Sequence, residues 1–164
     1  MTVVGVRVEL PSNTPIVLLR EQDGPRYLPI WIGAAEATAI ATAMENVEPP
    51  RPQTHDLMVM AIEELGATMA RVVVSEMRDS VFYADLVLAT PDGEIHLSAR
   101  PSDSIALAVR TGAPVYADPT VLAEAGIEIE DESEEQQIQR FREFLEDVTV
   151  EDFLGGEEGD PPSI

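Results

Sequence analysis

One pattern occurs twice along this chain and constrains its fold more than any other feature: three segments with strand periodicity precede two helical segments. Apolar residues alternate with polar ones in the strand segments, whereas the helical segments are rich in Ala or repeat apolar residues at helical spacing. The predicted strands are 3–10, 16–20, 27–32, 67–77, 81–89 and 94–99. The predicted helices are 33–47, 55–65, 102–111 and 119–125. We therefore predict the α+β class, with mixed sheets and a duplicated unit of three strands and two helices.

Individual residues also support the duplication. An offset of 67 residues aligns Leu28 with Ile95 and Glu36 with Asp103. Two copies of a half-domain commonly pack about a pseudo-twofold axis, with the starts of equivalent helices near each other. The duplication therefore predicts that Glu36 and Asp103, each near the start of a helix, lie close together.

Acidic residues are distributed unevenly along the chain. The segment up to Ile127 holds 17 acidic residues and 8 Arg, a net charge of −9, whereas the last 37 residues hold 14 acidic residues and 2 Arg, a net charge of −12. A segment this charged buries too little apolar surface to form a core. Apolar residues at helical spacing still predict a short amphipathic helix over about 133–148, followed by a disordered end. We expect a folded domain over 1–127 and an acidic tail over 128–164.

The composition excludes several kinds of site. The 164 residues include no Cys, and all ten basic residues are Arg. Disulfides, thiolate nucleophiles, Schiff-base lysines and phosphate-loop lysines are therefore excluded. The absence of Cys is typical of a reducing compartment, and the chain has neither a signal-peptide pattern at its start nor a run of about 18 apolar residues. We expect a cytoplasmic protein that does not enter a membrane.

Two segments combine Arg, Pro and Asp with the start of a predicted helix: RPQTHD at 51–56 and ARPSDS at 99–104. Backbone N–H groups at a helix start, together with a guanidinium, form a natural site for a phosphate. Arg51, Arg100 and Ser102 are therefore candidate phosphate ligands. Helix capping by Thr and Ser, with Asp favoured by the helix dipole, explains the same residues without a ligand, so both interpretations stay open.

The two His residues and three acids are the candidates for proton transfer and metal binding. His96 lies among apolar residues of a predicted strand, and we expect it to be half-buried. His55 lies beside Asp56 where a loop meets a helix, and it is the better candidate for acid–base chemistry. Glu36, Asp56 and Asp103 carry the oxygen ligands that Mg²⁺ or Mn²⁺ prefers, provided that the fold brings them together.

Four segments, in order, resemble the bifunctional nuclease domain family of bacteria and plants. They are LPIWIGAAEATAIA (28–41), PPRPQTHDL (49–57), VFYADL (81–86) and ARPSDSIALAVRTGAPVY (99–116). The resemblance spans 3–127, and it implies a compact, self-associating α+β domain that acts on DNA and RNA. It assigns functional positions to Glu36, His55 with Asp56, and Arg100 with Asp103. The family often has an acid just before ARPSD, where this chain has a Ser residue; if that acid binds metal, this chain lacks the ligand.

Together these observations predict a nuclease that hydrolyses phosphodiester bonds in DNA and RNA with the help of a divalent metal, Mg²⁺ or Mn²⁺. The predicted catalytic residues are His55, Asp56, Arg100 and Asp103, the substrate-binding residues are Arg51 and Ser102, and the metal ligands are Glu36, Asp56 and Asp103. The net charge of −21 opposes binding of a long duplex, so single-stranded DNA or RNA is the expected substrate. The alternative is a non-enzymatic oligomeric binding or regulatory protein whose RPSD and THD segments bind an anion or a protein partner.

Self-association is the first testable prediction. Apolar strands in both halves leave sheet edges and faces that a twofold mate commonly covers, so we expect a homodimer or a higher closed oligomer. Static light scattering at micromolar concentration measures the mass directly. A mass near 17.8 kDa, that of one chain, would contradict this prediction.

Overall fold

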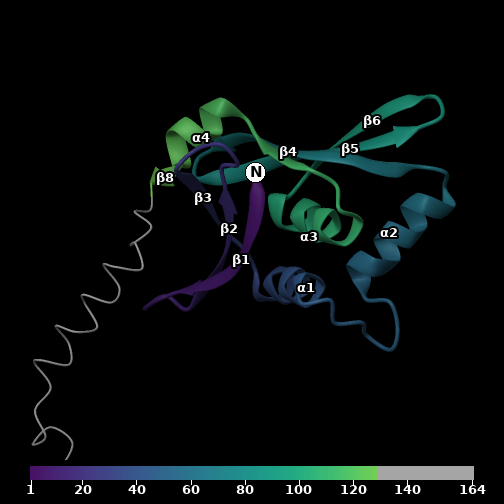
Figure 1. Cartoon of the computed structure of the whole chain (residues 1–164), viewed down its shortest axis with the longest axis horizontal. Helices are drawn as coiled ribbons and strands as arrows, with labels where there is room; N and C mark the ends of the chain where they lie inside the picture. The colour runs from purple at the N-terminus through teal and green to yellow at the C-terminus, as the bar shows by residue number, and fades with distance from the viewer. Residues whose placement is uncertain (129–164) are drawn as a thin grey trace, which may run out of the picture. The chain divides into compact units, whose positions relative to one another are not determined.

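The computed structural model describes residues 1–128, which form two sheets and four helices (Figure 1). The strands are β1 (Thr2–Glu9), β2 (Thr14–Arg20), β3 (Arg26–Trp31), β4 (Thr68–Arg78), β5 (Val81–Thr90), β6 (Gly93–Ala99), β7 (Val115–Ala117) and β8 (Ile127–Glu128). The helices are α1 (Ala34–Met44), α2 (Thr54–Glu64), α3 (Pro101–Thr111) and α4 (Pro119–Ala125). The predicted α+β class is confirmed. No helix of the described residues has the length and apolar character needed to cross a membrane.

Each half of the described chain builds its own sheet. The first sheet has the order β1-β2-β3-β8, and all of its neighbouring strands are antiparallel. The second has the order β6-β5-β4-β7, in which β4 and β7 are parallel and the other pairs are antiparallel. The prediction of mixed sheets is therefore wrong for the first sheet and right for the second. A parallel strand needs a crossover, and α3 provides one between β6 and β7.

The order of the six long strands and four helices agrees with the prediction. The short strands β7 and β8 were not predicted, and β7 separates α3 from α4 without a counterpart between α1 and α2. The duplication therefore stays a prediction. The first compact unit of the chain spans Met1–Ile129. The predicted tail helix over 133–148 and the predicted disordered end lie outside the described residues.

Local sequence explains where the functional helices begin and end. Pro101 is the first residue of α3, where its missing N–H costs no hydrogen bond, and Gly112 ends the helix with φ of 73°. The Thr and Ser residues expected to cap α2 and α3 are not the N-caps, which are Gln53 and Arg100. Thr54 is the first residue of α2, after the N-cap Gln53, and Ser102 is the second residue of α3.

Helices α1 and α3 pack on each other in the core. Helix α1 also packs on β1 and β2, and α3 packs on β4 and β5 (Figure 1). The side chains of Leu19, Leu28, Ile40, Ile105 and Leu107 are almost fully buried. Helix α1 follows the end of β3, and α3 follows the end of β6. Because both helices pack on the sheets and on each other, the positions of their first residues are fixed as well.

The sheet edges and α2 are more open than the core. His96, expected to be half-buried, lies on the edge strand β6 with 52% of its side chain exposed. It pairs with Val87 of β5, and its Nδ1 lies 2.7 Å from Asp85 Oδ2. Strands β1, β8, β6 and β7 are the edges of the two described sheets, and the predicted oligomer stays a prediction.

A paired substitution tests the placement of the core. We expect Ile105→Ala to lower the free energy of unfolding by about 2 to 5 kcal/mol, because it leaves a cavity beside the packed helices. The control is Ile95→Ala on β6, where the side chain is 47% exposed, with an expected change within about 0.5 kcal/mol. Urea denaturation measures both values, and equal losses would show that the core is placed wrongly.

Candidate active site

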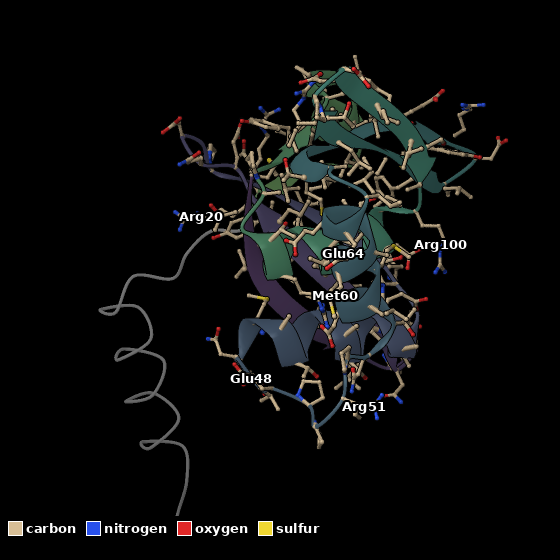
Figure 2. All side chains as sticks on the ribbon, turned by 90° about the vertical axis from the view of Figure 1, so that its right-hand side faces the viewer. Arg20, Glu48, Arg51, Met60, Glu64 and Arg100 are labelled. Atoms are coloured by element: carbon tan, nitrogen blue, oxygen red, sulfur yellow. The ribbon has the colours of Figure 1, made fainter. Side chains whose placement is uncertain are left out.

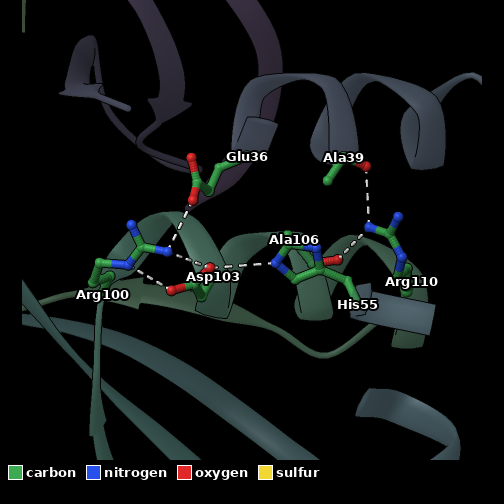
Figure 3. A network of polar contacts seen from close by, with 7 residues as sticks. All are labelled: Glu36, Ala39, His55, Arg100, Asp103, Ala106 and Arg110. Carbon is green, nitrogen blue, oxygen red and sulfur yellow. Dashed lines mark hydrogen bonds and ion pairs between the residues drawn. The ribbon is translucent and has the colours of Figure 1, made fainter. Parts of the chain in front are cut away.

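The first turns of α1 and α3 meet at one guanidinium group. Glu36 and Asp103 are each the third residue of their helix, where the helix dipole favours an acid. Arg100, the N-cap of α3, bridges them: Nη2 donates to Glu36 Oε1 at 2.9 Å and to Asp103 Oδ1 at 3.0 Å, and Nε donates to Asp103 Oδ2 at 2.7 Å (Figure 3). Hydrogen bonds to Asp103 first, and then to Glu36, raise the pKa of Arg100.

Helix α2 adds an imidazole to this arrangement. His55 Nε2 lies 3.3 Å from Asp103 Oδ1, and only 13% of the His55 side chain is exposed (Figure 3). Arg100 is far more open, with 66% of its side chain exposed. We call Glu36, His55, Arg100 and Asp103 the polar cluster. It joins two carboxylates, an imidazole and an exposed guanidinium from the starts of three helices.

Asp56 lies next to His55 in sequence but makes different contacts. Its Oδ1 accepts a hydrogen bond from Arg110 Nε at 2.6 Å, and its Oδ2 accepts one from the backbone N–H of Gln53 at 2.8 Å. The Arg110 hydrogen bond, followed by the Gln53 one, holds the pKa of Asp56 below its ordinary value. Asp56 thus fixes the start of α2 against α3, which positions His55 for its contact with Asp103.

Arg110 also connects α3 to α1. Its Nη1 donates to Ala39 O of α1 at 3.0 Å and to Ala106 O of α3 at 2.8 Å (Figure 3). Only 10% of the Arg110 side chain is exposed. Spacing in the sequence did not single out this residue, because its role depends on contacts with segments far away in the chain.

The two residues predicted to bind substrate lie in different surroundings. Ser102 is buried and lines a cavity together with Arg100. Arg51 is exposed on the loop between α1 and α2, and Figure 2 shows it well apart from Arg100. The structure therefore places Ser102 beside the polar cluster and leaves Arg51 away from it.

The three predicted metal ligands do not fit a divalent metal in this arrangement. The Arg100 guanidinium pairs with the carboxylates of both Glu36 and Asp103, and Asp56 is paired with Arg110 instead. Among residues 1–128, no group of three or more His, Cys, Asp or Glu side chains is arranged to hold a metal ion. A cation between Glu36 and Asp103 requires Arg100 to move away first.

Two cavities adjoin Arg100. The larger, of about 730 Å³, is lined by the whole polar cluster and by apolar side chains that include Met58, Leu97 and Leu107. The smaller, of about 380 Å³, is lined by residues that include Trp31, Phe82 and Ser102. Cavities of this size are typical of small-molecule sites.

Ser104 lines the larger cavity as well. Its hydroxyl is the one buried side-chain polar atom in the described chain without a hydrogen-bond partner. Buried polar groups normally have partners, so this hydroxyl is an exception among the described residues. The sequence analysis did not single out Ser104, although it lies within the ARPSDS segment.

Residues 17–130 match the family model described as the bifunctional nuclease domain. The chain belongs to this family. The predicted resemblance is confirmed, although the matched region begins later than the predicted start at residue 3. All four residues of the polar cluster lie inside this bifunctional nuclease domain.

The relatives of this chain include a bacterial protein that it matches over almost its full length and plant proteins that it matches over part of theirs. An uncharacterised protein of Mycobacterium tuberculosis (strain H37Rv) is 49% identical over 159 residues, covering 92% of this chain and 95% of that protein. Bifunctional nuclease 1 of Oryza sativa subsp. indica is 27% identical over 130 residues, covering 77% of this chain and 39% of that protein. Bifunctional nuclease 2 of Arabidopsis thaliana is 25% identical over 128 residues, covering 74% of this chain and 39% of that protein.

The Asp56–Arg110 pair predicts a pH-dependent stability. Because the folded-state pKa of Asp56 is lowered, its stabilisation is complete above the ordinary Asp value and is lost as the pH falls through the folded-state pKa. We expect Asp56→Asn to lower the free energy of unfolding by about 1 to 3 kcal/mol at pH 7, since Arg110 stays buried without its charge partner. The difference from the wild type should shrink below about pH 4.

Chemical denaturation at pH 7 and pH 3 measures this difference. The control is Asp92→Asn, the same substitution in an exposed turn, for which we expect a change within about 0.5 kcal/mol at both pH values. A deficit of Asp56→Asn that is equal at pH 7 and pH 3 would disprove the role assigned to the ion pair.

Proposed function

We propose that the polar cluster binds a phosphodiester group of single-stranded DNA or RNA and catalyses its hydrolysis. The observation that carries this proposal is an exposed guanidinium held at two helix starts, next to an imidazole that contacts a carboxylate. Membership of the bifunctional nuclease domain family supports the reaction class. The names of the plant relatives support it too, at low identity and over part of their length.

Arg100 binds the phosphate in this proposal. Its Nε and Nη2 hold Glu36 and Asp103, whereas its Nη1 makes no hydrogen bond with a described residue (Figure 3). The first backbone N–H groups of α3 lack helical partners and add further donors for an anion. Positive charge at this position stabilises the negative charge that develops on the phosphoryl oxygens in the transition state.

His55 moves the proton in this proposal. With Nε2–H donated to Asp103, the lone pair of Nδ1 accepts the proton of the attacking water molecule. The water oxygen forms the new P–O bond while the bond to the 5′-oxygen breaks, and the departing 5′-oxygen takes up a proton from solvent. Asp103 acts by orienting the imidazole. Asp56 is a positioning residue, because it acts through the start of α2.

Assistance by Mg²⁺ or Mn²⁺ stays a prediction. The acidic side chains are bound to Arg100 and Arg110, so no step above passes through a metal ion. Activity with and without EDTA tests this point separately from the roles of His55 and Asp103. Loss of cleavage in EDTA, with recovery in Mn²⁺, would show that the reaction needs a divalent metal.

A single strand suits the site better than a duplex. The net charge of −21 repels a long, stiff polyanion along its whole length, whereas a flexible strand reaches a local site with few phosphates near the surface. The proposal therefore predicts faster cleavage of single strands than of duplexes of the same sequence, and a strong dependence on ionic strength.

The proposed reaction is tested with two matched His–Asp pairs. We expect His55→Ala and Asp103→Asn to lower kcat on labelled RNA and single-stranded DNA by about 100-fold or more. The controls are His96→Ala and Asp85→Asn, which alter the other His–Asp pair, in the second sheet, and should change kcat by less than about twofold. Circular dichroism and urea denaturation verify that all four variants fold.

The outcomes separate the two candidate functions. Cleavage that survives in both His55→Ala and Asp103→Asn would place the reaction elsewhere. Absence of cleavage with every metal, in a folded wild-type protein, would favour the alternative: a non-enzymatic oligomeric binding or regulatory protein that uses the RPSD and THD segments as an anion or protein-partner site.

A further inference from the structure

The smaller cavity has aromatic side chains in its wall and shares Arg100 with the larger cavity that His55 lines. The smaller cavity is lined by Trp31 and Phe82 and, at its polar side, by Arg100, Ser80 and Ser102. Trp31 is the only Trp of the chain, and 52% of it is exposed. The polar cluster uses none of these aromatic side chains, so the proposed reaction leaves this cavity without a role.

The orientation of Trp31 is fixed by a hydrogen bond. Its Nε1 donates to Glu9 Oε2 at 2.9 Å, which satisfies the polar edge of the indole and leaves its faces to apolar contacts. Val81 and Phe82 from the start of β5 line the same cavity. A planar, apolar group therefore has an aromatic partner here, and hydroxyls and a guanidinium at the edge of the cavity.

We propose that this cavity holds one unpaired nucleobase, stacked on Trp31, of the strand whose phosphate Arg100 binds. The inference rests on the proposed function, because it is Arg100 that places the phosphate between the two cavities. The aromatic side chains of the cavity can stack on a planar base, while Arg100 beside them binds the phosphate joined to that base. Stacking on aromatic side chains accepts any of the bases. A base in a duplex is stacked on its neighbours, so it cannot enter the cavity without unpairing.

Trp31 fluorescence reports on this subsite without any cleavage. The probe is (dT)4, titrated into the wild type in EDTA at low ionic strength, and the matched probe is an abasic tetranucleotide with the same phosphates. We expect (dT)4 to quench the fluorescence and to bind about 10-fold or more tightly than the abasic chain. Equal affinities would overturn the base subsite, whether or not the protein proves to be a nuclease.

Variants give a second readout with dye-labelled (dT)4 and fluorescence anisotropy. Trp31→Leu and Phe82→Leu keep apolar side chains in the cavity, and we expect each to weaken (dT)4 binding about fivefold or more and abasic binding by less than twofold. The control is Tyr116→Leu, which removes an exposed aromatic side chain from β7 and should change neither affinity. Equal losses for both probes would overturn the subsite, whereas selective loss without any cleavage would support it and overturn the proposed reaction alone.

Discussion

The close packing of α1 against α3 is the constraint on which the site depends. A single guanidinium nitrogen, Arg110 Nη1, bonds to a backbone carbonyl of each helix, so the two backbones lie within reach of one side chain. Small buried residues on both helices permit this approach; they are Ala37, Ala39, Ala106 and Ala108. Because each helix directly follows a strand, their first turns also meet, and Arg100 connects them through Glu36 and Asp103.

This arrangement explains how a strongly acidic chain can offer a phosphate site. The cation of the polar cluster is held by two carboxylates, and one of its nitrogens makes no hydrogen bond with a described residue. One guanidinium and a helix start supply limited affinity against a net charge of −21, so a substrate gains from contacts that do not depend on charge. The apolar walls of the two cavities, including Trp31 and Leu97, offer such contacts.

Periodicity in the sequence was enough to predict the six long strands, the four helices and the α+β class. It could not predict β7 and β8, because strands of three and two residues show no alternation. The RPSD and THD segments singled out His55, Arg100 and Asp103, and the offset of 67 residues singled out Glu36, but only the fold shows that the four residues meet. The partner of Asp56 was missed, since Arg110 lies 54 residues away and nothing in its spacing marks it as a competitor for a metal ligand.

The most direct test of the account is a crystal structure of the chain with a short, nuclease-resistant single-stranded oligonucleotide. The account predicts a phosphate oxygen within about 3 Å of the Arg100 guanidinium, with His55 facing the same phosphate. A well-ordered strand bound elsewhere, with Arg100 still paired only with Glu36 and Asp103, would contradict it.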